Sequence, residues 1–390
     1  MSLFESEAVR REQFPVVARQ IFLGHAGVTA LPACAAEAMA AQARASSEQQ
    51  QEFADVLRVI AATRALCGRT IGAGADEIAL LGPTALGLSL FANGLDWQTG
   101  DEIVCYADDY PSNVYPWTAL SRSGVHVRFV AADQPGRITV DAVRDALTAK
   151  TRMVALASCH YLTGWRIDLP AIGQLLRERG ILFSLDAIQT VGAFPTDAGC
   201  VDFLSADAHK WMLGPMAIGI VFVARRNFEL CRPTLVGAWN VKSPDFIAQA
   251  EIHFEETARR YEPGVLNATG IYGMKASLEL LENTGLEQVS TAILGLRDRL
   301  EERLDALGFE FLSPKAPEPL RSGILTVRHP GFDSMALFDA LTSENITASL
   351  RGARNGSSWL RFSPHFYNTS EELDKVADVL AASLRRGSAA

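Results

Sequence analysis

A lysine stands beside a histidine in a run of small and apolar residues, where His209 precedes Lys210. Lysine is rarely buried unless it is paired. In a dry pocket its amine loses charge more easily and becomes a nucleophile that can form a Schiff base. An ordinary exposed loop lysine is the alternative interpretation of this pair alone. What the lysine does therefore depends on the groups that accompany it.

A carboxylate precedes this lysine at the end of an apolar segment. The run from Ile181 to Leu185 is typical of a buried strand in a parallel sheet, and Asp186 follows it. Open α/β sheets bind ligands at the carboxyl ends of their strands. Pyridoxal 5'-phosphate (PLP) requires a carboxylate for its pyridinium nitrogen and a lysine for its Schiff base. Asp186 and Lys210 together predict a PLP site.

The segments 186–193 and 205–211 resemble those of the class V aminotransferase family, which includes the cysteine desulfurases. The resemblance runs from about Phe22 to the end of the chain. It implies the α/β fold of a fold-type I PLP-dependent transferase, and strand-like and helical runs that alternate along the chain agree with this. We expect a large domain with a mainly parallel, seven-stranded type of sheet and a small α+β C-terminal domain. The expected ranges are 1–20 for an N-terminal arm, 21–270 for the PLP-binding domain and 271–390 for the small domain, which packs with the N-terminal segment.

The resemblance also implies the residues that bind the cofactor. Thr84 and Ala85 lie where a strand turns into a helix, and a helix N-terminus binds anions, so we expect the phosphate there. The alternative is that Thr84 only caps the helix. Tyr110 is expected to stack on the PLP ring, and Gln189 to donate to its phenolic oxygen. His209 is expected to touch the cofactor.

Two positions depart from the family pattern. Many members have asparagine where this chain has Tyr161, which leaves that contact to the phenolic oxygen open. The desulfurases have a phosphate-binding serine where this chain has Asp207, and an ionised carboxylate cannot donate a hydrogen bond. Whether Asp207 caps a backbone turn instead stays open at this stage.

Substrate residues are implied in the same way. Arg361 matches the arginine that grips the substrate carboxylate, and Arg351 matches a second arginine of the pocket; arginine suits a two-point grip on a carboxylate. His25 and Ala26, between Gly24 and Gly27, match a turn beside the substrate. His25 could equally be a structural histidine.

The sequence indicates the cofactor more clearly than it indicates the reaction. Desulfurases that pass sulfur as a persulfide carry a cysteine in the loop that corresponds to Gly352–Ser358, and this loop contains none. We expect transamination of a small α-amino acid through a Schiff base with PLP. The alternative is a C–S lyase that eliminates at the β-carbon of cysteine or an S-substituted cysteine without a catalytic cysteine. An amino-acid epimerase and a non-catalytic PLP-fold scaffold are less favoured.

Composition excludes other classes. The 390 residues carry a net charge of −9, which argues against nucleic acids and anionic membranes as partners. The charged N-terminus does not resemble a secretory signal, no apolar run has membrane length, and the six cysteines form no C-x-x-C pair. We expect a cytoplasmic protein that holds no metal. The stretch 260–267 resembles a loop that reaches a neighbour's phosphate, so we expect a homodimer with shared active sites and Gly264 at the cofactor.

Overall fold

A seven-stranded sheet forms the centre of the larger part of the molecule. The computed structural model describes residues 4–48, 51, 53–313 and 316–387. The strand order is β2-β8-β7-β6-β5-β3-β4, and only β8 runs antiparallel to its neighbours. The sheet is therefore mainly parallel, as the sequence predicts. Its strands are β2 (Ile78–Leu80), β3 (Glu102–Cys105), β4 (His126–Phe129), β5 (Thr151–Ala157), β6 (Leu182–Asp186), β7 (Phe203–Asp207) and β8 (Gly219–Val223).

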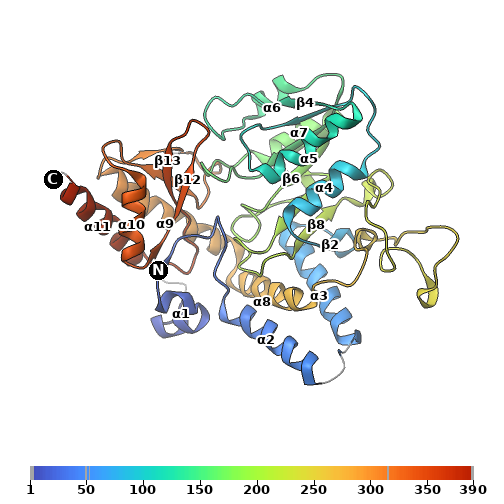
Figure 1. Cartoon of the computed structure of the whole chain (residues 1–390), viewed down its shortest axis with the longest axis horizontal. Helices are drawn as coiled ribbons and strands as arrows, with labels where there is room; N and C mark the ends of the chain where they lie inside the picture. Colours follow the sequence, from blue (N-terminus) through green and yellow to red (C-terminus); the bar gives the residue numbers. More distant parts are fainter. Residues whose placement is uncertain (1–3, 49–50, 52, 314–315, 388–390) are drawn as a thin grey trace.

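Both faces of this sheet are covered, which explains why its strands are apolar at nearly every position. Successive side chains point to opposite faces: Phe203 belongs to the core cluster that includes α4 and α5, and Leu204 belongs to the cluster that includes α6 and α7. Figure 1 shows α4 and α6 over different parts of the sheet. The helices are α4 (Thr84–Gly94), α5 (Tyr115–Thr118), α6 (Val140–Ala146) and α7 (Leu169–Glu178).

A further helical layer contains α2 (Ala33–Glu48), α3 (Phe53–Ile71) and α8 (Ala268–Thr284). Both α2 and α3 pack against α8 (Figure 1). The sequence suggests one helical stretch from Ala33 to Arg69, whereas the structure has two helices. Gln51 belongs to neither helix. None of the described helices is long and apolar enough to span a membrane.

The small C-terminal part is α+β, as expected. Its antiparallel sheet has the order β12-β13-β10-β9 and packs with three helices around a separate apolar core. The orange and red elements of Figure 1 form this part. Its elements are α9 (Leu286–Asp305), β9 (Glu310–Phe311), β10 (Leu325–Arg328), α10 (Ser334–Ser343), β12 (Ser349–Gly352), β13 (Ser358–Phe362) and α11 (Ser370–Gly387).

The N-terminal segment is attached to this small part. Strand β1 (Ile21–Phe22) pairs in parallel with β11 (Ile346–Thr347). In α1 (Glu7–Gln13), Arg10 donates through Nη1 to the backbone oxygen of Tyr367 at 2.9 Å, and the Phe14 ring stacks on the Tyr367 ring. The packing of the N-terminal segment on the small part is therefore extensive, while the exact domain boundaries stay a prediction.

Gly87 sets how closely α4 approaches β7, and we predict that Gly87→Ala destabilises the protein. A Cβ at this position would lie 2.4 Å from the Ser205 Oγ atom, so the helix must shift. We expect a loss of about 1–3 kcal/mol, as for other overpacked cores, seen as a lower urea midpoint at unchanged slope.

Gly295→Ala is the matched control. Gly295 also lies within a helix, α9, but its Cβ would meet nothing within 4 Å. Alanine should therefore raise the free energy of unfolding by about 0.5–1 kcal/mol. Equal midpoints for the two variants would contradict the close-packing argument.

Candidate active site

The carboxyl ends of five strands meet at one edge of the large sheet, and each is followed by a residue of interest. Because β2, β3, β5, β6 and β7 all run the same way, their following loops converge there. A cavity of about 510 Å³ opens at this edge. The residues that these five strands deliver to its wall are Thr84, Tyr110, Tyr161, Asp186, His209 and Lys210.

Lys210 lies buried in this cavity and faces Tyr110. Its Nζ atom is 5.5 Å from the centre of the Tyr110 ring. Burial lowers the pKa of the Lys210 amine, the charge of Asp186 opposes that effect, and the arginines at the far end of the cavity lower the pKa further. The amine is thus neutral, and nucleophilic, at lower pH than an exposed lysine.

Asp186 is a buried carboxylate at the end of β6. Its Oδ1 atom accepts the N–H of Ile188 at 3.1 Å. Burial raises the pKa of Asp186 most, and the charge of the neighbouring Asp109 raises it further. A protonated ring nitrogen placed beside Asp186 would supply the positive charge that favours its ionised form.

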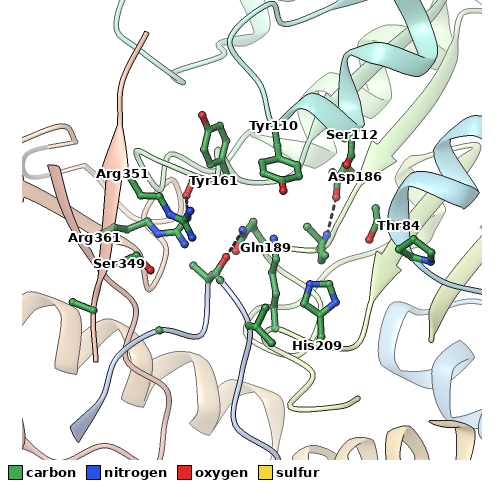
Figure 2. A pocket seen from close by; sticks show the side chains of 18 of the residues that line it. Thr84, Tyr110, Ser112, Tyr161, Asp186, Gln189, His209, Ser349, Arg351 and Arg361 are labelled. Carbon is green, nitrogen blue, oxygen red and sulfur yellow. Dashed lines mark hydrogen bonds between the residues drawn. The ribbon is translucent and has the colours of Figure 1, made fainter. Parts of the chain in front are cut away.

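One end of the cavity suits a phosphate. Thr84 begins helix α4, whose N-terminus is preceded by Pro83 and has no side-chain cap. The Thr84 Oγ1 atom accepts the N–H of Asp207 at 2.9 Å, so its own proton remains to be donated. The helix dipole, the amides of the first turn (including that of Ala85) and this hydroxyl all favour an anion. Figure 2 shows Thr84 and His209 at this end.

Gln189 is held between Trp211 and the turn that precedes α2. Its Oε1 atom accepts the indole N–H of Trp211 at 2.8 Å, and its Nε2 atom donates to the backbone oxygen of Ala26 at 3.1 Å. This pattern fixes the orientation of the amide, since Trp211 can only donate. The second Nε2 proton is left for a ligand.

The opposite end of the cavity carries two arginines (Figure 2). Arg361 is only 2 % exposed and donates through Nη1 to the backbone oxygen of Tyr161 at 2.6 Å. Its Nε and Nη2 atoms are buried and have no hydrogen-bond partner among the described residues. Burial, and then the charge of Arg351, lower the pKa of Arg361. Such unpaired buried donors are costly unless a ligand satisfies them, and a carboxylate matches them best.

Two sequence-based assignments are not among the cavity residues. His25 is fully buried, and its two ring nitrogens are engaged by the Ser363 backbone oxygen and the Tyr367 hydroxyl, each at 2.8 Å. It therefore serves the packing of the turn, the alternative given above, whereas Ala26 lines the cavity. Gly264 lies outside this cavity, and its role at a neighbour's cofactor stays a prediction.

The structure adds cavity residues that the sequence did not indicate. They are Phe22, Val28, Pro83, Ser112, Ile188, Thr347, Ala348 and Ser349. Most of them carry no reactive group. Thr347 and Ser349 belong to the short strands β11 and β12 of the small part, which are too short to show a periodic pattern. The structure also answers the question about Asp207. Its carboxylate accepts backbone N–H groups, so Asp207 does cap a backbone turn.

A model of the family described as Aminotransferase class-V matches residues 21–376. The chain belongs to the class V aminotransferase family. It is therefore a PLP-dependent enzyme with the fold-type I architecture that the sequence predicts.

Several relatives of this class V enzyme are named for sulfur chemistry. A probable cysteine desulfurase of Methanothermobacter thermautotrophicus is 25% identical, with 97% of this chain and 98% of that protein aligned. Another, from Pyrococcus abyssi, is 27% identical over 80% of this chain and 79% of its own.

Solved structures share the fold over nearly the whole chain. The apo cysteine desulfurase of Thermococcus onnurineus NA1 matches with a TM-score of 0.89 at 21% identity, covering 99% of this chain and 100% of its own. The cystine C–S lyase C-DES, solved with its product cysteine persulfide, matches at 0.86 and 24% identity, covering 95% and 99%.

The residues of the class V enzyme fit PLP from end to end. Thr84, Ala85 and His209 would hold the phosphate, Asp186 the ring nitrogen, and Lys210 the aldehyde carbon. The bound cofactor supplies an electron sink for bonds at the substrate α-carbon. Among the described residues, no group of three or more His, Cys, Asp or Glu is arranged to hold a metal ion.

We predict that Asp186→Asn leaves the cofactor on Lys210 but lowers turnover at least tenfold, about 1.4 kcal/mol in barrier, because a neutral amide does not hold the ring nitrogen protonated. Capture of PLP by the apo variant should also shift to lower pH. Asp186 is the group that chiefly raises the pKa of Lys210, so its removal lowers the pH at which the amine becomes neutral.

Borohydride reduction and peptide mapping should place the adduct on Lys210 in both proteins, while absorbance follows capture against pH. Asp133→Asn, an exposed carboxylate paired with Arg137, should change neither measurement. Normal turnover, or an adduct on another lysine, would contradict the assignment.

Proposed function

We propose that this enzyme cleaves the C–S bond of cysteine or an S-substituted cysteine by β-elimination, without a catalytic thiol. The observation that carries the proposal is the composition of the cavity. It combines Lys210, Asp186 and the unpaired donors of Arg361, while none of the six cysteines lines it. The loop between β12 and β13 also contains none.

The relatives support sulfur chemistry. The two relatives named above are probable cysteine desulfurases, and one structural neighbour is a cystine C–S lyase. Their identities to this chain are 27% or lower, so the substrate is our inference and rests on the pocket.

Arg361 and Lys210 have different roles in this reaction. Arg361 holds the α-carboxylate and so places the α-hydrogen near Lys210. The Lys210 amine removes that proton, and the sulfur leaves the β-carbon with the electron pair of the broken bond. With one water, an S-substituted cysteine then gives pyruvate, ammonia and a thiol, and Lys210 returns the proton.

Transamination is the second candidate, although it is the reaction that the sequence alone predicts. The family description as aminotransferase supports it, and Lys210 and Asp186 serve both reactions. The two differ in products, because transamination gives a keto acid without ammonia and needs an amino-group acceptor.

We predict that the PLP-loaded enzyme forms pyruvate and ammonia in equal amounts, with one thiol from each S-alkyl-cysteine and one cysteine persulfide from each L-cystine. A variant in which all six cysteines are replaced should, if folded, keep this activity, because none of them contacts the cavity. Product assays and circular dichroism provide the measurement. Keto acid formed only with an acceptor would favour transamination. Loss of turnover on replacing one cysteine, with PLP still bound, would show thiol catalysis.

Arg361→Ala is the companion variant. It should lower kcat/KM, with a loss of transition-state stabilisation of about 2–5 kcal/mol, the range for breaking a buried charge pair. Arg328→Ala is the control, because this small-domain arginine pairs with Glu310 outside the cavity.

We further infer a homodimer with shared active sites, supported by the loop 262–267. Glu262 is buried and accepts the N–H of Leu80 at 2.8 Å, which anchors the loop beside β2. Beyond this anchor Val265 is 81% exposed, so the tip projects away from its own subunit. The segment between β8 and α8, yellow in Figure 1, also exposes Val236, Phe246 and Ile247. We take these exposed apolar residues as candidates for contact with a second subunit.

We predict that sedimentation shows a dimer and that Val265→Asp, which places a charge at the proposed interface, weakens it. Met335→Asp is a matched control, since Met335 is an exposed apolar residue of the small part. An active monomer at assay concentration would contradict the shared site.

A further inference from the structure

Asp207 and His209 form a hydrogen-bonded pair at the phosphate end of the cavity. The Nδ1 atom of His209 lies 2.8 Å from the Asp207 Oδ2 atom. The Asp207 side chain is 1% exposed, whereas that of His209 is 19% exposed and lines the cavity. The carboxylate therefore lies behind the ring, and the ring stands between it and the ligand space.

Asp207 is rigidly held by the backbone around it. Its Oδ1 atom accepts the N–H groups of Ala208 and Ile218, both at 3.0 Å. Its own N–H donates to the Thr84 Oγ1 atom. Asp207 thus connects the start of α4, the end of β7 and the start of β8, and its carboxylate takes part in three hydrogen bonds.

This arrangement determines which proton the ring carries. An ionised carboxylate can only accept, so the Nδ1 atom of His209 must be the donor. The Nε2 atom is then free for the cavity. A neutral ring would present a lone pair there, which repels a phosphate oxygen, whereas a doubly protonated ring presents an N–H.

The phosphate end needs such a cation. The described residues that line it are Pro83, Thr84, Ala85, Ser112 and His209, and His209 is the one among them that can be positively charged. The two arginines of the cavity lie at its opposite end (Figure 2), and Lys210 is committed to the Schiff base.

We propose that Asp207 is a positioning residue for the cofactor phosphate, which acts through His209. Its carboxylate fixes the ring by the Nδ1–H bond and balances the charge of a doubly protonated imidazole, whose Nε2–H serves the phosphate. Charge-assisted hydrogen bonds of this kind are about twice as strong as neutral ones. This role is the same for elimination and transamination.

The test compares apo-enzyme affinities for PLP and for pyridoxal, which lacks the phosphate. Asp207→Asn keeps an oxygen for the two backbone N–H groups but turns an amide N–H toward Nδ1. The ring is then neutral, and its Nε2–H is an uncharged and therefore weaker donor. We expect the Kd for PLP to rise at least about tenfold, or 1.4 kcal/mol. The Kd for pyridoxal should be unchanged.

A double-mutant cycle separates positioning from a purely structural role. In a His209→Gln background, Asp207→Asn should change the Kd for PLP by less than about twofold, because its effect passes through the ring. Additive losses, or an equal loss of pyridoxal affinity, would overturn the proposal.

Nitrogen-15 NMR of the wild-type holoenzyme keeps the proposal testable if Asp207→Asn does not fold. With histidine labelled and His209→Gln used for assignment, both ring nitrogens of His209 should be protonated at neutral pH. An unprotonated Nδ1 or Nε2 would overturn the proposal. Failure of the wild-type apo-enzyme to bind either PLP or pyridoxal would instead challenge the Lys210 assignment.

Discussion

Keeping Lys210 and Asp186 out of water is the constraint on which the rest of the structure depends. A buried amine and a buried carboxylate each cost free energy when charged, and each partly offsets the cost of the other. They can lie close together only because β6 and β7 are adjacent and parallel, which places the end of one strand beside the loop of the other. The covered faces of the sheet then exclude solvent from both groups.

The two ends of the cavity bind anionic groups with different kinds of donor. The phosphate end uses backbone amides, a threonine hydroxyl and one histidine, whereas the carboxylate end uses an arginine whose remaining donors are unpaired. One ligand that is anionic at both ends and flat in the middle satisfies them together. The cost of leaving such donors unpaired lies in the free protein, so ligand binding recovers it.

Sequence reasoning worked well where a reactive residue follows a long apolar strand. The sequence predicts Asp186 at the end of a strand and Thr84 at the start of a helix after a strand, and the structure has both there. Buried parallel strands are apolar, and the residues that follow them share one edge of the sheet. It worked less well where a residue has two plausible environments. His25 lies in a small-residue turn, and only the contacts with Ser363 and Tyr367 decide that it faces the interior. The strands around Ser349 are too short to show an alternation of apolar and polar residues in the sequence.

The pairing of β1 with β11 has a consequence for synthesis of the chain. Ile21 pairs with Ile346, so the segment that carries Ala26 leaves the ribosome 325 residues before its partner strand. At bacterial and eukaryotic elongation rates this delay is on the order of tens of seconds. The sheet edge that holds Lys210 and Thr84 has all its strands by Val223, well before Arg361 is made. A nascent chain therefore completes the phosphate end first, and the end that selects the substrate is assembled last.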